Sequence, residues 1–163
     1  MYTTQGIILK KTGFGEADAL YTIYTKDYGK IRARAQGVKK EGAKLKGHLE
    51  TLNLARIGFI LGKNGERLTH AELQNAWLGI RGDFEKLGAA VYMTELVDRH
   101  CLTGEKDEAL WRLLTDSFGE LEAVPGTDLP KFLQNFEIKL LDCLGYAGEK
   151  DIRTLGEAVL RPF

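Results

Sequence analysis

The sequence has little of what a covalently cross-linked or metal-held fold needs. Its 163 residues include two cysteines, Cys101 and Cys143. Two thiols cannot build a four-cysteine zinc site or a disulfide framework. We therefore expect no metal and a reduced, cytoplasmic protein.

Long apolar runs are also missing. No stretch approaches the roughly 18–20 apolar residues that a membrane span requires, so we expect no membrane association. The first residues, MYTTQG, show no basic run followed by a long apolar run. We therefore expect no secretory signal.

Catalytic patterns are absent as well. The sequence contains no Walker, kinase, nucleophile-elbow or zincin motif. Its three histidines, His48, His70 and His100, are scattered, and the neighbouring carboxylates Glu16 and Asp18 have no histidine close in sequence. We predict no catalytic residues, no cofactor and a protein that is not an enzyme.

The net charge of zero is a sum of two opposite halves. Residues 1–80 hold 13 basic and 7 acidic side chains, a net charge of +6, whereas residues 81–163 hold 10 basic and 16 acidic side chains, a net charge of −6. Such asymmetry suggests that one half binds anions and that the other half has a different task.

The basic half reads as short strands. Residues 30–36 alternate between apolar and cationic side chains, which is typical of a half-buried strand with a basic outer face. In residues 51–61 the apolar residues change from even-numbered to odd-numbered positions. A bulge between Ala55 and Ile57 would place both sets on the same face of the strand. Asn64-Gly65 indicates a hairpin. Five strands with a short insertion at 42–49 predict an N-terminal oligonucleotide/oligosaccharide-binding (OB) barrel over residues 1–80, with other small barrels still open.

From residue 81 onward the apolar period changes to that of helices. Phe84, Leu87, Val91, Tyr92 and Leu96 form a first apolar stripe, and two further stripes follow near residues 110–121 and 133–144. Short connections predict a small antiparallel helical bundle over residues 81–163. The fold class is therefore all-β plus all-α, in two domains. A last amphipathic segment is expected at 152–160.

Cations dominate one segment of the basic half. Between residues 26 and 46 there are eight Lys or Arg side chains against two carboxylates. Cations that alternate along a strand and continue into a loop are able to track a phosphate backbone. The alternative is a solvated strand face, which ordinarily mixes charges of both signs. The predicted DNA-contacting cations are Lys30, Arg32, Arg34, Lys39, Lys40, Lys44, Lys46 and Arg56.

Aromatic residues are interleaved with these cations. Exposed rings are able to stack on unpaired bases, although most rings in a small barrel belong to its core. Tyr24 and Tyr28 lie nearest the cations in sequence and are the predicted stacking residues. Phe14 lies in the first loop.

An ordered series of segments resembles the RecO family of bacterial recombination mediators. The segments are GFGEADAL (13–20), YTIYT (21–25), YGKI (28–31), AQGVKK (35–40), KLKGHLE (44–50), LTHAEL (68–73), YMTELVDR (92–99) and FEIKLLDCLGY (136–146). The resemblance extends from residue 1 to about residue 147.

The resemblance implies an OB domain followed by a helical domain in a bacterial, cytoplasmic, nucleoid-associated protein. It implies binding of single- and double-stranded DNA, annealing of complementary strands, and loading of RecA onto DNA coated by single-strand-binding protein (SSB). The implied partners are RecR, RecF in some settings, and the acidic C-terminal tail of SSB. Family members often carry a four-cysteine insertion after the Leu-Gly-Tyr segment; residues 149–163 have no cysteine, so we expect a short form without zinc.

Two other functions remain open at this point. The chain is alternatively an interaction adaptor that binds an acidic protein tail such as that of SSB, or an OB module that binds RNA. Competition between an acidic peptide, RNA and DNA would discriminate these alternatives.

Overall fold

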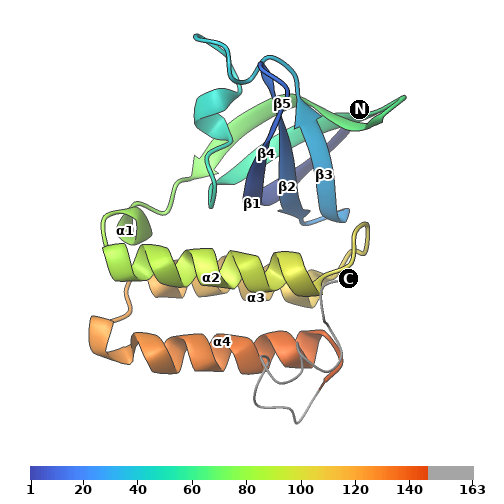
Figure 1. Cartoon of the computed structure of the whole chain (residues 1–163). Coiled ribbons are helices and arrows are strands. Elements are labelled where there is room, and N and C mark those ends of the chain that lie inside the picture. The colour runs from blue at the N-terminus through green and yellow to red at the C-terminus, as the bar shows by residue number, and fades with distance from the viewer. Residues whose placement is uncertain (147–163) are drawn as a thin grey trace. The chain divides into compact units, whose positions relative to one another are not determined.

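The computed structural model describes residues 1–146, and within them the chain forms two compact units (Figure 1). The barrel unit contains residues 1–76 and 102–106. The helical unit contains residues 77–101 and the described residues from 107 onward. The expected division at residue 80 between autonomous domains stays a prediction.

The barrel unit is a closed five-stranded sheet. Its strands are β1 (Tyr2–Phe14), β2 (Asp18–Thr25), β3 (Gly29–Ala35), β4 (Leu54–Gly62) and β5 (Gly65–Asn75), and a short 3₁₀ helix, η1 (Lys46–His48), precedes β4. The strand order is β1-β2-β3-β5-β4, and β1 pairs with β4 to close the barrel. Among the five named strands, β3 and β5 pair in parallel, at Ala33–Glu66 and Arg34–Arg67. This arrangement, followed by helices, confirms the predicted fold class.

Alternation along β3 places its side chains as the sequence pattern predicts. Ile31, Ala33 and Ala35 belong to the barrel core. Because successive residues of a strand point to opposite faces, Lys30, Arg32 and Arg34 lie on the outer face, which we call the outer β3 face.

The bulge predicted in β4 is not found there. The register between β4 and β5 shifts at Leu54/Ala55 and again at Gly58/Phe59, and in both places the extra residue lies on β5, at Gln74 and at Thr69. Ala55, Ile57 and Phe59 all face the core. The prediction was wrong because it took Leu54 rather than the small Ala55 as the first core-facing residue of the strand.

The helical unit contains α1 (Leu78–Arg81), α2 (Phe84–His100), α3 (Glu108–Leu121), the 3₁₀ helix η2 (Gly126–Asp128) and α4 (Leu129–Cys143). Figure 1 shows α3 running back along α2 and α4 reversing direction again. Carboxylates begin two of these helices: Asp83 accepts hydrogen bonds from the backbone N–H groups of Glu85 and Lys86, and Asp107 accepts one from Leu110 N–H. These three bonds satisfy donors that have no partner inside the helix.

The buried face of α2 differs from the predicted stripe. Phe84 is 91% exposed and Val91 is also exposed, whereas Ala89, Met93 and Val97 are buried. The pattern misled because alanine and methionine, rather than the larger Phe84, form the packed face. Elsewhere in the unit, the rings of Trp77 and Phe118 meet edge to face at 5.5 Å.

None of the helices in residues 1–146 is sufficiently long and apolar to cross a membrane. The amphipathic segment expected at 152–160, and the short form inferred from residues 149–163, lie outside the described residues.

Candidate nucleic-acid interface

The outer β3 face presents three cations at alternate positions. Opposite them across the β2–β3 pairing lie Tyr24 beside Lys30, Thr22 beside Arg32, and Leu20 beside Arg34. Arg32 is exposed, and Lys30 and Arg34 are half-buried. Since alternate residues of a strand are spaced by about 6.5–7 Å, the three charges form a row along the barrel.

A shallow groove continues this row toward the β4–β5 hairpin. It has a volume of about 270 Å³, and its lining includes Arg34 from β3, Lys63 and Asn64 from the turn, and Glu66 and Arg67 from β5. We call it the hairpin groove. The parallel pairing of Arg34 with Arg67 brings two guanidinium side chains to neighbouring strands. With Lys63, three cations face one carboxylate.

An exposed aromatic ring borders the same face. Phe14 ends β1, is 50% exposed, and lies with its ring centroid 5.6 Å from the guanidinium carbon of Arg34. A cation over an aromatic face is attracted by the ring quadrupole, so the contact orients both side chains. The ring keeps an accessible surface on which a base is able to stack.

Two cations of the outer β3 face are available to an anionic ligand. Within the described part of the chain, Arg32 and Arg34 form no ion pair with a carboxylate. Cations that outnumber the carboxylates near them concentrate positive potential over the barrel surface. Phosphates that approach it displace condensed counterions, which favours binding at low salt.

The cations of the β3–β4 connector (residues 36–53) divide into two sets. Lys39 is tied down, since its Nζ donates to the Gly15 carbonyl at 2.9 Å and its backbone N–H donates to Ala17. Lys40, Lys44 and Lys46 are exposed. The connector therefore holds the β1–β2 turn against the start of the loop and leaves three ammonium groups for solvent or a ligand.

Arg56 does not join this surface. It lies on β4, where its register partners are Gln5 on β1 and Glu72 on β5. In the strand order, β5 separates β4 from β3. The DNA contact predicted for Arg56 stays a prediction, on a different part of the barrel.

The two predicted stacking residues are not disposed for stacking. Tyr24 is 1% exposed, and a ring without an open face cannot accept a base. The prediction for Tyr24 was wrong because nearness to cations in sequence carries no information about burial. The half-buried Tyr28 packs edge to face against Tyr2 and Phe59, with centroids 5.5 Å apart in each pair. Its role in DNA contact stays a prediction.

The sequence reasoning did not place Phe14, Lys63 and Arg67 in the site, although the structure brings them to it. What these three residues share is that they lie at or next to a turn between two strands. Phe14 flanks the β1–β2 turn, and Lys63 and Arg67 flank the β4–β5 turn, the two loops that border the ligand face of OB folds.

Two titratable side chains of the helical unit have shifted pKa values, and neither belongs to a metal-binding group among the described residues. No group of three or more His, Cys, Asp or Glu side chains suited to a metal occurs among residues 1–146. Burial, together with the positive charge of Arg99, lowers the pKa of His100. Burial raises the pKa of the Cys143 thiol, with Asp107 and Asp142 adding to the effect. Both shifts favour neutral side chains packed in the helical unit.

Comparison with known proteins gives a consistent result along the chain. Residues 1–77 match the family model "Recombination protein O N terminal", and residues 81–149 match "Recombination protein O C terminal". Similar curated proteins are each named DNA repair protein RecO. That of Heliobacterium modesticaldum is 35% identical over 91% of this chain and 53% of its own length. The protein of Roseiflexus is 34% identical over 90% of this chain and 50% of its own length. The protein of Synechococcus elongatus is 31% identical over 99% of this chain and 60% of its own length.

The chain thus spans about half to three fifths of the length of the relatives it matches. The two family models follow one another in the order of the barrel strands and the helices and together cover most of the sequence. The chain therefore belongs to the RecO family.

Proposed function

We propose that this chain acts in DNA repair as a non-catalytic DNA-binding module, with single-stranded DNA on the outer β3 face and in the hairpin groove. One observation carries the proposal: Lys30, Arg32 and Arg34 lie in a row on the outer face of a five-stranded barrel. In OB folds the same strands and the two bordering loops bind oligonucleotides. The names of the relatives support the repair role.

The contacts in this proposal are of two kinds. Lys30, Arg32, Arg34, Lys63 and Arg67 contact phosphates, which position the strand without reading its sequence. Phe14 stacks on a base, a contact worth about 1–3 kcal/mol that tolerates any base. The result is binding with steep salt dependence and little sequence preference.

Strand annealing follows from the same surface. Two complementary strands repel one another through their phosphates, and a row of cations that neutralises some of them lowers this repulsion. Bases then meet more often. No nucleotide hydrolysis is needed for this step.

The proposal extends to double-stranded DNA, to RecA loading and to the partners RecR, RecF and the SSB tail, as the family resemblance implies. Because the chain spans about half the length of its relatives, these functions are assigned to the chain only as part of the proposal.

A second candidate, a protein-interaction adaptor, is favoured by a different observation. Leu78 and Phe84, at the start of the helical unit, are 76% and 91% exposed. Exposed large apolar side chains of this kind are typical anchors for a partner. In that case the basic barrel would serve an acidic protein tail.

Fluorescence anisotropy of a labelled, unstructured single-stranded oligonucleotide tests the proposal. The chain is titrated across a salt series, and we expect log affinity to fall by about 0.7 per phosphate neutralised for each unit of log salt. No binding at low salt would contradict the proposal. Competition by an acidic peptide that binds when DNA does not would favour the adaptor, and tighter binding of structured RNA would favour an RNA-binding module.

A further inference from the structure

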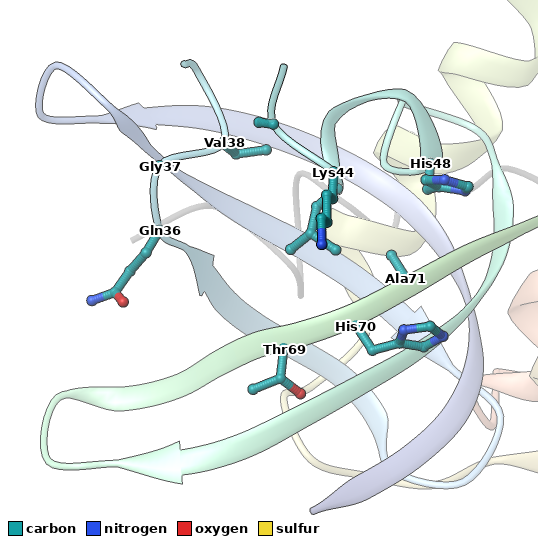
Figure 2. Close-up of a pocket in the computed structure, with 10 residues that line it drawn as sticks. Gln36, Gly37, Val38, Lys44, His48, Thr69, His70 and Ala71 are labelled. Atoms are coloured by element: carbon teal, nitrogen blue, oxygen red, sulfur yellow. The ribbon is translucent and has the colours of Figure 1, made fainter. Parts of the chain in front are cut away.

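A second hollow of the barrel unit, larger than the hairpin groove, lies between the β3–β4 connector and β5. It has a volume of about 480 Å³, within the range of small-ligand sites. Figure 2 shows its walls, with Lys44 and His48 on the connector and Thr69, His70 and Ala71 on β5. We call it the connector pocket.

Three side chains that line the connector pocket bring cationic or N–H donors to it. Lys44 supplies an ammonium group, and His48 and His70 each supply an imidazole N–H, whereas the Thr69 hydroxyl donates to Met1 Sδ at 3.3 Å; no carboxylate lines the pocket. Its apolar lining includes Val38, which belongs to the barrel core, and the partly buried Leu45, which packs against that core. Such a site suits a ligand that combines anionic acceptors with a flat apolar part.

The fold fixes which nitrogen of His48 faces a ligand. His48 Nδ1 accepts the backbone N–H of Leu73 at 2.9 Å, so the neutral ring carries its proton on Nε2. The His48 carbonyl accepts from Asn53 Nδ2 at 3.1 Å, which fastens the connector beneath it. The neutral His48 ring therefore has its one N–H on Nε2, and the backbone that carries the ring is held in place.

The connector pocket begins where the hairpin groove ends. Arg67 of the groove donates from Nη1 to Gln36 Oε1 at 3.2 Å, and Gln36 lines the connector pocket. Because this bond uses the amide oxygen of Gln36, its NH₂ group remains as a further donor. Thr69 follows Arg67 by two residues on β5. The two hollows are thus joined through one hydrogen-bonded pair.

We propose that the connector pocket binds one nucleotide, with its phosphate at Lys44, His48 and His70 and its base against the partly buried Leu45. In the full interaction this is the nucleotide that follows the strand held on the outer β3 face. The inference rests on the proposed function for its place along the strand, whereas binding of a free nucleotide does not depend on that function.

Heteronuclear NMR of the imidazole side chains tests the pocket directly. The full chain is titrated with thymidine monophosphate, with thymidine and with inorganic phosphate. We expect saturable shifts of the His48 and His70 signals with thymidine monophosphate, and weaker binding of both fragments. Equal affinity for inorganic phosphate and for the nucleotide would overturn the assignment of a nucleotide, and so would the absence of any shift.

Two lysines of the connector provide matched variants. Lys44→Ala removes the ammonium group of the pocket and should weaken binding of thymidine monophosphate about tenfold, the effect of losing one charge-assisted hydrogen bond. Lys46→Ala removes the same charge from an exposed position that does not line the pocket. If the two variants lost the same affinity for thymidine monophosphate, general electrostatic attraction would explain the binding, and the proposal would be overturned.

A third variant separates this inference from the proposed function. Arg32→Ala with Arg34→Ala disables the outer β3 face, so oligonucleotide affinity should fall while thymidine monophosphate still shifts His48 and His70. If the unmodified chain binds oligonucleotides but the nucleotide shifts neither histidine, the pocket fails and the proposed function stands. If the nucleotide binds but oligonucleotides do not, the pocket stands and the proposed function fails.

Discussion

The two units of the molecule place their charges in opposite ways. In the barrel unit, alternation along β3 gathers cations into one row on the outer face. In the helical unit, acidic side chains begin helices: Asp83 caps α2 and Asp107 caps α3. The carboxylates of Asp83 and Asp107 accept hydrogen bonds from the backbone of their own helices. Arg32 and Arg34 on the outer β3 face form no ion pair among the described residues and are able to bind a ligand.

The units also differ in what holds them together. The barrel depends on pairings between distant segments, such as β1 with β4 and β3 with β5. The helical unit depends more on caps and on contacts between side chains of neighbouring helices, such as Trp77 with Phe118. We therefore expect substitutions at close backbone contacts to damage the barrel most, and substitutions at caps to have smaller effects.

The largest effect is expected from Gly29→Ala in the barrel unit. Gly29 has φ +65°, and a Cβ there would overlap the backbone of Glu105. Residues 102–106 pair with β3 at this point, with Gly104 N–H donating to the Lys30 carbonyl at 2.9 Å. Strained backbone and steric overlap together should lower the free energy of unfolding by more than about 3 kcal/mol, measured by urea denaturation.

Gly15→Ala is the matched control for Gly29. Gly15 has φ +71° but no heavy atom within 4 Å of a built Cβ. It therefore reports the cost of the left-handed conformation alone, about 1–2 kcal/mol. Equal losses at the two glycines would show that the contact with residues 102–106 contributes nothing.

The next effect concerns DNA affinity. Arg32→Ala with Arg34→Ala should weaken binding of single-stranded DNA at least tenfold, by roughly the loss of one or more charge-assisted contacts, and lower the salt slope by about 1 to 1.5. The chain should remain folded because Arg32 is exposed and Arg34 is half-buried. Anisotropy across a salt series measures both quantities.

Arg112→Ala with Lys131→Ala removes the same number of charges from exposed positions of α3 and α4. It should leave DNA affinity nearly unchanged. If this pair weakened binding as much as the pair on β3, net charge rather than the outer β3 face would explain the interaction.

A smaller effect is expected at the start of α2. Asp83 Oδ1 accepts from Glu85 N–H at 3.0 Å and from Lys86 N–H at 3.2 Å. Asp83→Ala should lower the free energy of unfolding by about 1 kcal/mol. Asp128 occupies the same position before α4 without a side-chain capping bond, so Asp128→Ala should cost less; a reversed order in thermal denaturation would contradict the assignment of the caps.

The smallest effect at neutral pH is expected in the barrel core. The Tyr21 hydroxyl is buried without a hydrogen-bond partner among the described residues. Tyr21→Phe should therefore raise the free energy of unfolding by a few tenths to about 1 kcal/mol. Chemical denaturation at neutral pH, compared between the two chains, measures this gain.

Alkaline pH should enlarge the difference in stability between Tyr21→Phe and the parent chain. Burial, with the charge of Glu50 adding to it, raises the pKa of Tyr21 from 10.0 to about 12. Between these values the unfolded chain loses the proton and the folded chain keeps it, so stability falls as pH rises. Tyr21→Phe should lose less stability over this window than the parent chain in urea denaturation at a series of pH values; an equal loss in the two chains would contradict the buried state of Tyr21.

The fold was predictable from sequence where the local pattern of apolar and charged residues alone determines which side chains are buried. The alternation from Lys30 to Gln36 sufficed to assign the basic face, because a strand leaves no other arrangement for such residues. Residue type also marks helix ends: Asp107 caps the start of α3, and Gly145, with φ +89°, follows the end of α4.

The rest depended on tertiary packing. Tyr24 and Phe14 are both aromatic residues near cations, yet Tyr24 is buried and Phe14 is exposed, and nothing in their local sequence separates them. The contribution of Arg67 needed the parallel pairing of β3 with β5, which joins segments more than 30 residues apart in sequence. The stripe predicted on α2 was right for Leu96, which is buried, and wrong for Phe84, which is exposed while Ala89 and Ala90 are buried.

Mapping by heteronuclear NMR of backbone amides, with a short single-stranded oligonucleotide added to the full chain, tests the central claim most directly. The account predicts that the largest shifts fall on β3, on the β1–β2 turn near Phe14 and on the β4–β5 turn near Lys63. Shifts concentrated in α2, α3 and α4, with the β3 amides unmoved, would contradict it.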